Sequence, residues 1–133
     1  MTQQWQELAR AIQQELAEIP AAMRQEEVQR QTIILLLAAA LRQMGLTPVP
    51  AWKPPKSTRQ HIDLVGVAPG SDPPRVEVAL VVDPLVELPK VKSLEWVECP
   101  QKVVVTFSPR KDKVQQSSFF LTPDLEHLDI PAA

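Results

Sequence analysis

The stretch from Arg75 to Ser108 decides the fold of this chain. It reads RVEVALVVDPLVELPKVKSLEWVECPQKVVVTFS, and both of its ends are rich in β-branched residues. Residues 75–83 and 102–108 are therefore predicted strands. A short helix between them is indicated by apolar residues at every third position, at Leu88, Val91, Leu94 and Val97. A strand, a helix and a second strand at this spacing form a right-handed crossover, so the two strands should be parallel.

The segment before this stretch supplies a hairpin. Residues 61–68 are rich in β-formers, and the turn-forming cluster PGSDPP at 69–74 separates them from the strand at 75–83. This pattern predicts an antiparallel pair. Residues 47–52 are short and extended, and their two prolines confine them to an edge of the sheet.

Two helices are predicted before the strands. Residues 2–19 carry apolar side chains at helical spacing on one side only, which is typical of an amphipathic helix. Residues 21–44 are polar in their first half and apolar in their second, so this helix should run from the surface into the core. Gly45 suits the position just after its end.

Weaker patterns cover the end of the chain. Residues 109–113 are predicted to be a charged loop, residues 118–122 a last short strand and residues 123–128 a helical turn. The order α-α-β-β-β-α-β predicts an α/β fold with a small mixed sheet. The expected parts are an added N-terminal helix at 1–20, a core at 21–123 and an acidic tail at 124–133.

Composition limits the classes of function. Hydrophobic residues make up 44% and charged residues 23% of the 133 residues, which is ordinary for a globular domain. The single cysteine, Cys99, excludes an internal disulfide and a zinc site built on cysteines. The most apolar run, residues 33–41, is far shorter than the roughly 20 residues that span a membrane. Because the start also lacks the pattern of a secretory signal, we expect a cytoplasmic protein without a membrane span.

Two acidic residues on the predicted hairpin point to a family. Asp63 lies in the strand IDLV, and Glu77 lies in the strand VEVA, with thirteen residues between them. Together with the order of helices and strands, they resemble the restriction-endonuclease-like superfamily with its PD-(D/E)xK signature, and in particular Holliday-junction-resolvase-type members. Ala79 replaces the lysine of that signature, so the motif is degenerate. Glu27, with Glu26 as a rival, is similar in position to a glutamate that resolvase-like members carry near the start of the long helix.

The resemblance implies magnesium-dependent cleavage of a phosphodiester. Asp63 and Glu77 would hold the ion, because Mg²⁺ prefers oxygen ligands. Glu27 would add a ligand or orient a water molecule. The lysine of the family stabilises charge that develops at the phosphorus, a role that alanine cannot fill. Lys90 and Lys92, on the predicted crossover helix, are the candidates to replace it.

A basic stretch runs from Val28 to Ile62, with five Lys or Arg residues and no Asp or Glu. Lys53, Lys56 and Arg59 precede the strand of Asp63, where the nucleases of this fold approach the DNA backbone. They are therefore the candidates for contacts with phosphates.

Three hypotheses remain open from the sequence. The first is a non-catalytic nuclease-like domain that acts as a protein-interaction or assembly module and needs no cofactor. The second is a magnesium-dependent DNA nuclease with Lys90 or Lys92 as a displaced lysine. The third is a non-catalytic module that binds nucleic acid. A protein partner or a second copy would contact the N-terminal helix or an exposed tryptophan, Trp52 or Trp96.

Overall fold

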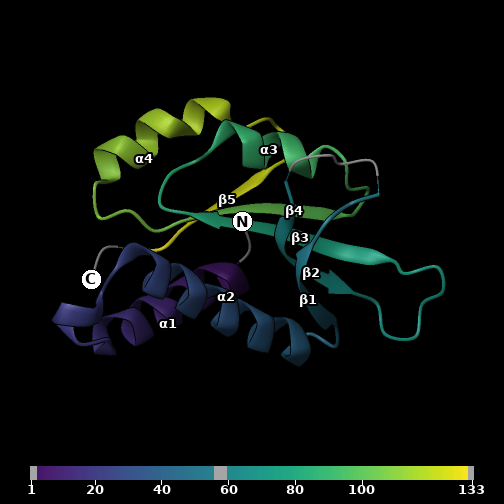
Figure 1. Ribbon diagram of the computed structural model, residues 1–133, viewed down its shortest axis with the longest axis horizontal. Helices are drawn as coiled ribbons and strands as arrows, with labels where there is room; N and C mark the ends of the chain where they lie inside the picture. The colour runs from purple at the N-terminus through teal and green to yellow at the C-terminus, as the bar shows by residue number, and fades with distance from the viewer. Residues whose placement is uncertain (1–2, 56–59, 132–133) are drawn as a thin grey trace.

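A computed structural model describes residues 3–55 and 60–131 (Figure 1). The elements within these residues are α1 (Gln3–Glu18), a 3₁₀ turn (Ala21–Met23), α2 (Glu26–Gln43), β1 (Thr47–Trp52), β2 (Ile62–Val67), β3 (Val76–Asp83), α3 (Leu88–Leu94), β4 (Gln101–Thr106), α4 (Lys111–Ser117), a second 3₁₀ turn (Ser118–Phe120) and β5 (Glu126–Asp129). None of the helices in these residues is long and apolar enough to cross a membrane.

The five described strands form one mixed sheet in the order β1-β2-β3-β4-β5. β1, β2 and β3 are antiparallel neighbours, whereas β3, β4 and β5 run parallel. This arrangement confirms a mixed α/β fold. The predicted hairpin is β2 with β3, and the predicted parallel pair is β3 with β4, which α3 connects. The prolines of residues 47–52 lie on an edge strand, as proline requires.

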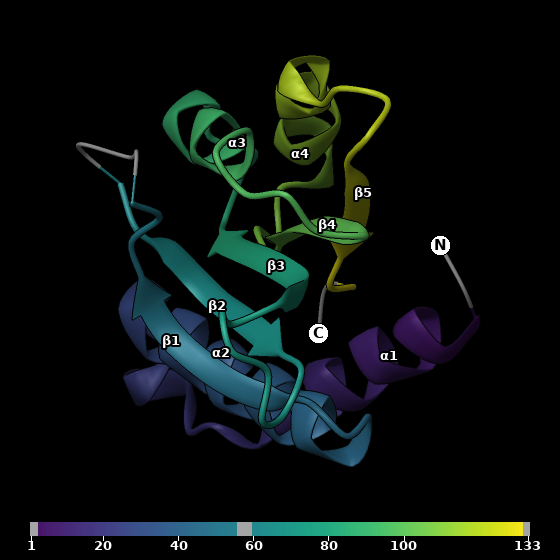
Figure 2. The same ribbon diagram turned by 90° about the vertical axis from the view of Figure 1, so that its right-hand side faces the viewer.

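Helices cover the sheet on both faces (Figures 1 and 2). In Figure 2, α1 and α2 lie below the sheet and α3 and α4 lie above it. The side chains of β3 alternate accordingly: Leu80 and Val82 pack in the core beneath the sheet, whereas Ala79 and Val81 pack on the other side. β4 is also buried on both faces, which explains why residues 103–105 are continuously apolar.

The N-terminal helix packs on its own domain. Trp5, Ala9, Ile12 and Leu16 form its buried stripe, and α1 contacts both α2 and β5. Burying an isoleucine side chain such as that of Ile12 stabilises a fold by roughly 1.5–3 kcal/mol. The stripe that the sequence offers to a partner is thus occupied within the chain.

The structure corrects the prediction for the end of the chain. α4 begins within the predicted charged loop, at Lys111. The predicted strand at 118–122 is wrong, since residues 118–120 form a 3₁₀ turn. The predicted helical turn at 123–128 is also wrong, because β5 begins at Glu126 and pairs with β4. The segment 124–133 therefore contributes an edge strand, and the sequence EHLD has no alternation of apolar residues that would have revealed it.

Candidate functional site

Asp63 is the centre of a charged cluster near the start of β2. Its side chain is completely buried. Oδ1 accepts a hydrogen bond from Nη2 of Arg30 and another, of 2.8 Å, from Nζ of Lys90. Oδ2 accepts one of 3.0 Å from the same ammonium and one of 2.7 Å from the backbone N–H of Val82. An ionised carboxylate offers about four lone-pair positions, so the donors around Asp63 fill them all.

Three further elements, α2, α3 and β3, bring these donors to β2. Arg30 comes from the second turn of α2, and its Nε also donates to the carbonyl of Val82 at 2.9 Å. Lys90 comes from the first turn of α3. The two cations lie on helices that cover opposite faces of the sheet, so Asp63 connects both helical layers at the start of β2.

Asp83, the last residue of β3, is the second carboxylate of the cluster. Its oxygens lie 3.9 Å from Nε of Arg30 and 4.0 Å from Nζ of Lys90, so these contacts are longer than those of Asp63. Burial raises the pKa of Asp83 to about 6; Lys90 opposes this rise, and the negative charge of Asp63 adds to it. With both aspartates ionised, two cations and two anions balance.

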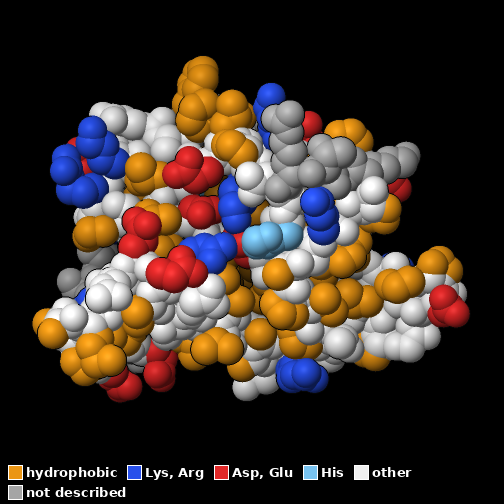
Figure 3. All heavy atoms as spheres, viewed as in Figure 1, with side chains coloured by type: hydrophobic (Ala, Val, Ile, Leu, Met, Phe, Trp, Pro, Cys, Tyr) orange, Lys and Arg blue, Asp and Glu red, His pale blue; other side chains and the backbone are white. Residues whose placement is uncertain are grey.

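Glu27 lies on the rim of this cluster, one helical turn before Arg30. It is 3.3 Å from Nη1 of Arg30, but its side chain is 68% exposed. A hydrogen bond from Gln31 lowers the pKa of Glu27, and Arg30 lowers it further. In Figure 3, acidic and basic side chains gather near the middle of this face, between the positions of α2 and α3 in Figure 1.

His61 joins the cluster from the loop before β2. Its Nε2 lies 3.4 Å from Oδ1 of Asp63, and its side chain is 48% exposed. Sequence reasoning missed this residue. The spacing of His61 and Asp63 could have revealed it, because residues two apart on an extended chain share a face.

Glu77 does not join Asp63, contrary to the sequence prediction. The last paired residues at this end of the hairpin are Leu64 and Leu80, and beyond them the Asp63 carboxylate accepts a hydrogen bond from the N–H of Val82. Five residues of strand, roughly 16 Å, separate Val82 from Glu77. Glu77 instead forms an ion pair of 2.5 Å with Arg75. The carboxylate that approaches Asp63 is Asp83.

The two candidate lysines behave differently. Lys90 points to Asp63 and is largely buried, whereas Lys92 is exposed. Residues two apart on a helix do not share a face, so only one of them could reach the cluster. Of the candidates for phosphate contacts, Lys53 is exposed just after β1, and Lys56 and Arg59 lie outside the described residues.

A metal ion would need oxygen ligands with free lone pairs. Among residues 3–55 and 60–131, no three His, Cys, Asp or Glu side chains are placed together to hold one. Asp63 and Asp83 lie in the same cluster, but Arg30 and Lys90 contact both of them. As it stands, the arrangement is a closed ion-pair cluster.

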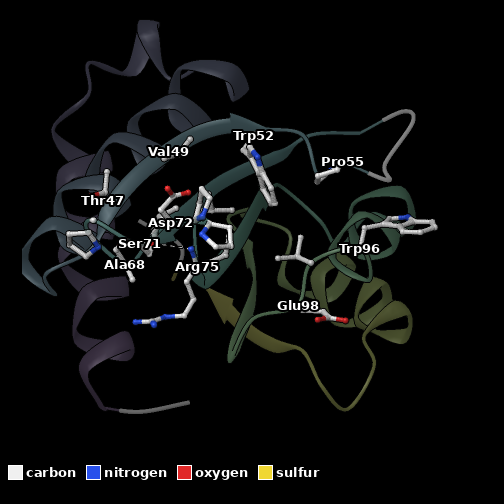
Figure 4. Close-up of a pocket in the computed structure, with 18 residues that line it drawn as sticks. Thr47, Val49, Trp52, Pro55, Ala68, Ser71, Asp72, Arg75, Trp96 and Glu98 are labelled. Atoms are coloured by element: carbon white, nitrogen blue, oxygen red, sulfur yellow. Dashed lines mark hydrogen bonds between the residues drawn. The ribbon is translucent and has the colours of Figure 1, made fainter.

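A groove of about 1160 Å³ lies along the hairpin, and its lining does not include Asp63, Arg30 or Lys90 (Figure 4). Its floor is apolar and includes Val49, Trp52 and Val67, and the turn between β2 and β3 forms one wall. Trp96, at the end of α3, forms another wall and is 55% exposed. Of the two tryptophans proposed for a partner, Trp96 is thus exposed and Trp52 is half-buried.

Comparisons with known proteins do not assign the chain to a family. No family model, no curated protein and no solved structure matches it.

Proposed function

We propose that this chain is a non-catalytic, restriction-endonuclease-like domain that serves as a protein-interaction or assembly module. The observation that carries the proposal is the closed state of Asp63, whose lone pairs are all taken by Arg30, Lys90 and a backbone N–H. The succession of helices and strands and the position of Asp63 at the start of β2 support the resemblance.

The register strengthens the case against catalysis. In the family that the chain resembles, the second carboxylate faces the aspartate from the next strand. Here Glu77 instead pairs with Arg75, and Asp83, the carboxylate of β3 that approaches Asp63, lies against Arg30 and Lys90. Mg²⁺ takes oxygen ligands, so cations beside both aspartates stand where the ion would bind.

The energetic cost of opening the site points the same way. A metal ion can reach Asp63 only if Lys90 or Arg30 withdraws from it. Removing one partner of a buried ion pair costs about 3–5 kcal/mol. Metal coordination would have to offset that cost before it could activate a water molecule.

A second candidate function is a metal-dependent nuclease with a displaced lysine. One observation favours it: Nζ of Lys90 lies within 3.0 Å of both oxygens of Asp63 and 4.0 Å from Asp83. An ammonium beside two carboxylates is the combination that phosphodiester cleavage uses. In this version Asp83 takes the place that the sequence assigned to Glu77.

Metal titration and cleavage assays separate the two candidates. Isothermal titration with Mg²⁺ and Mn²⁺ should give no saturable heat, and branched, duplex and single-stranded DNA should stay intact. Cleavage that requires the metal and disappears in Asp83→Asn and Lys90→Met would contradict the proposal. Lys92→Met is the matched control for Lys90, because it removes a lysine from the exposed side of the same helix.

The assembly role needs a separate test. The groove beside Trp96 is an apolar hollow with an exposed aromatic side chain on its rim, and apolar anchors dominate the energetics of protein interfaces. Substituting Trp96→Lys should abolish stoichiometric co-purification of a defined partner from native cells, while Lys92→Glu leaves it intact. Equal recovery with both variants would refute a role for this surface, and a chain that stays monomeric and without partner would refute assembly altogether.

A further inference from the structure

A second polar cluster lies at the carboxyl ends of β4 and β5, apart from Asp63. Thr106 is fully buried. Its Oγ1 lies 2.7 Å from Oδ1 of Asp129 and 2.8 Å from Nε2 of His127, and both partners belong to β5. Lys111 of α4 completes the cluster: its Nζ lies 3.1 Å from Oδ2 of Asp129 and donates to the carbonyl of Ile130 at 2.7 Å.

The hydrogen bonds of Thr106 fix the tautomer of His127. A threonine hydroxyl has a single proton, and an ionised carboxylate can only accept. The hydroxyl therefore donates to Asp129 and accepts from His127, so Nε2 of the neutral ring carries the proton. Any further proton must then bind at Nδ1.

Charge is balanced in this cluster only while His127 is neutral. Three elements face the ring: β4 with Thr106, which is uncharged, α4 with the cation Lys111, and β5 itself with the anion Asp129. Lys111 and Asp129 already neutralise each other. A protonated His127 would add a positive charge that no second anion within residues 3–55 and 60–131 offsets, in a half-buried place where charges are poorly solvated.

β5 is the element that would respond. It is an edge strand of four residues with β4 as its strand neighbour. Leu128 and Ile130 hold it against the core that α1 covers, and Ile130 donates its N–H to the carbonyl of Thr106 at 2.8 Å. We infer that protonation of His127 loosens the attachment of β5 to the sheet, so that this strand opens more often in acid than at neutral pH.

The direction of the pKa of His127 agrees with this charge balance. Burial lowers the pKa, Lys111 lowers it further, and Asp129 opposes both. The folded state thus prefers the neutral ring. The stabilisation that the neutral ring gives to the folded state is complete above the unfolded-state pKa of about 6.5. It declines as the pH falls from that value to the folded-state pKa, and it does not change further below the folded-state pKa.

Amide hydrogen exchange tests the inference at single residues. His127→Gln is the reference, since the glutamine Nε2 can still donate to Thr106 but does not titrate. The protection of the Ile130 amide, divided by its protection in His127→Gln at the same pH, should be constant above pH 6.5 or so and fall below it. The limit for one proton is a fall of about tenfold per pH unit. The Ala68 amide, which donates to Arg75 at the far end of the hairpin, should show no such fall.

A constant ratio at Ile130, or an equal fall at Ala68, would overturn the inference. A second variant, Lys111→Met, tests whether the charge of His127, rather than its packing, affects the attachment of β5. Without Lys111, Asp129 favours the protonated ring, so the pKa of His127 measured by NMR should rise above its value in the native chain. An unchanged or lower value would contradict the charge balance on which the inference rests.

Discussion

Asp63 shows how a buried carboxylate is supplied with hydrogen-bond donors in this fold. Its side chain has no exposed area, and Arg30, Lys90 and the N–H of Val82 compensate for the lost water. Such a group stabilises the fold only as long as every partner is present, because an unpaired buried charge is strongly destabilising.

Replacing Lys90 tests this dependence. Lys90→Met should lower the free energy of unfolding by about 3 kcal/mol, near the low end for a broken buried ion pair, because Arg30 still contacts Asp63. Lys92→Met should change it by no more than about 0.5 kcal/mol, as is usual at exposed positions. Urea denaturation of the three proteins measures both changes. A loss for Lys90→Met as small as that for Lys92→Met would contradict the closed cluster.

Asp83 gives the cluster a pH dependence of known sign. Its pKa rises from 3.8 to about 6 in the folded chain, mainly through burial. The folded state therefore binds this proton more tightly than the unfolded state. The stabilisation that the protonated Asp83 carboxyl gives to the folded state is fully present below the unfolded-state pKa of 3.8. It is lost as the pH rises from 3.8 to about 6.

Asp83→Asn should remove this dependence. The stability of the variant relative to the native chain should increase as the pH rises through that interval and level off above it. Urea denaturation at a series of pH values measures the difference, and ¹³C NMR of the carboxyl reads the pKa directly. A difference that does not vary with pH would show that Asp83 does not titrate within the interval.

At the scale of elements, the hairpin of β2 and β3 sets the geometry of the site. The sequence predicted this hairpin and the crossover through α3, because β-branched runs, a proline-rich turn and a helical spacing are local patterns. It could not predict the register. The spacing of the motif paired Asp63 with Glu77, whereas the register, with its irregularity between Gly66 and Val67, brings the end of β3 at Val82 to Asp63.

Lys90 was recognisable as a candidate, but its partner Arg30 was not. Lys90 was considered because Ala79 leaves the resembled signature without its lysine, whereas the contact of Arg30 depends on where α2 crosses the sheet. Likewise, the four residues of β5 were not recognisable, because pairing with β4 rather than local propensity makes them a strand.

Gly66 reports on the packing of α2 against the hairpin. A Cβ at this position would lie 2.9 Å from Cγ1 of Val78, 3.0 Å from Cδ1 of Leu46 and 3.3 Å from Cδ2 of Leu41 in α2. Gly66→Ala should therefore destabilise the fold by about 1–3 kcal/mol, the usual cost of overpacking. Thermal unfolding measures this cost, and Gly66→Ala combined with Val78→Ala should recover part of it. A fully stable single variant would mean that α2 and the hairpin are less closely packed than described.

At the scale of the whole molecule, the charged cluster joins the two helical layers where β2 begins and β3 ends. Arg30 belongs to the layer of α1 and α2, and Lys90 belongs to the layer of α3 and α4 (Figure 2). The groove near Trp96 lies elsewhere, where these layers leave part of the hairpin uncovered. The proposed loss of catalysis and the proposed gain of an interaction surface thus concern separate regions of one fold.

The central claim is that Asp63 is closed to metal ions. Anomalous X-ray scattering from crystals soaked in Mn²⁺ tests it most directly, because manganese is located without reference to activity. We expect no anomalous peak within coordination distance of Asp63, with Arg30 and Lys90 still in place. A manganese ion bound to both Asp63 and Asp83, with Lys90 displaced, would contradict the claim and favour the nuclease.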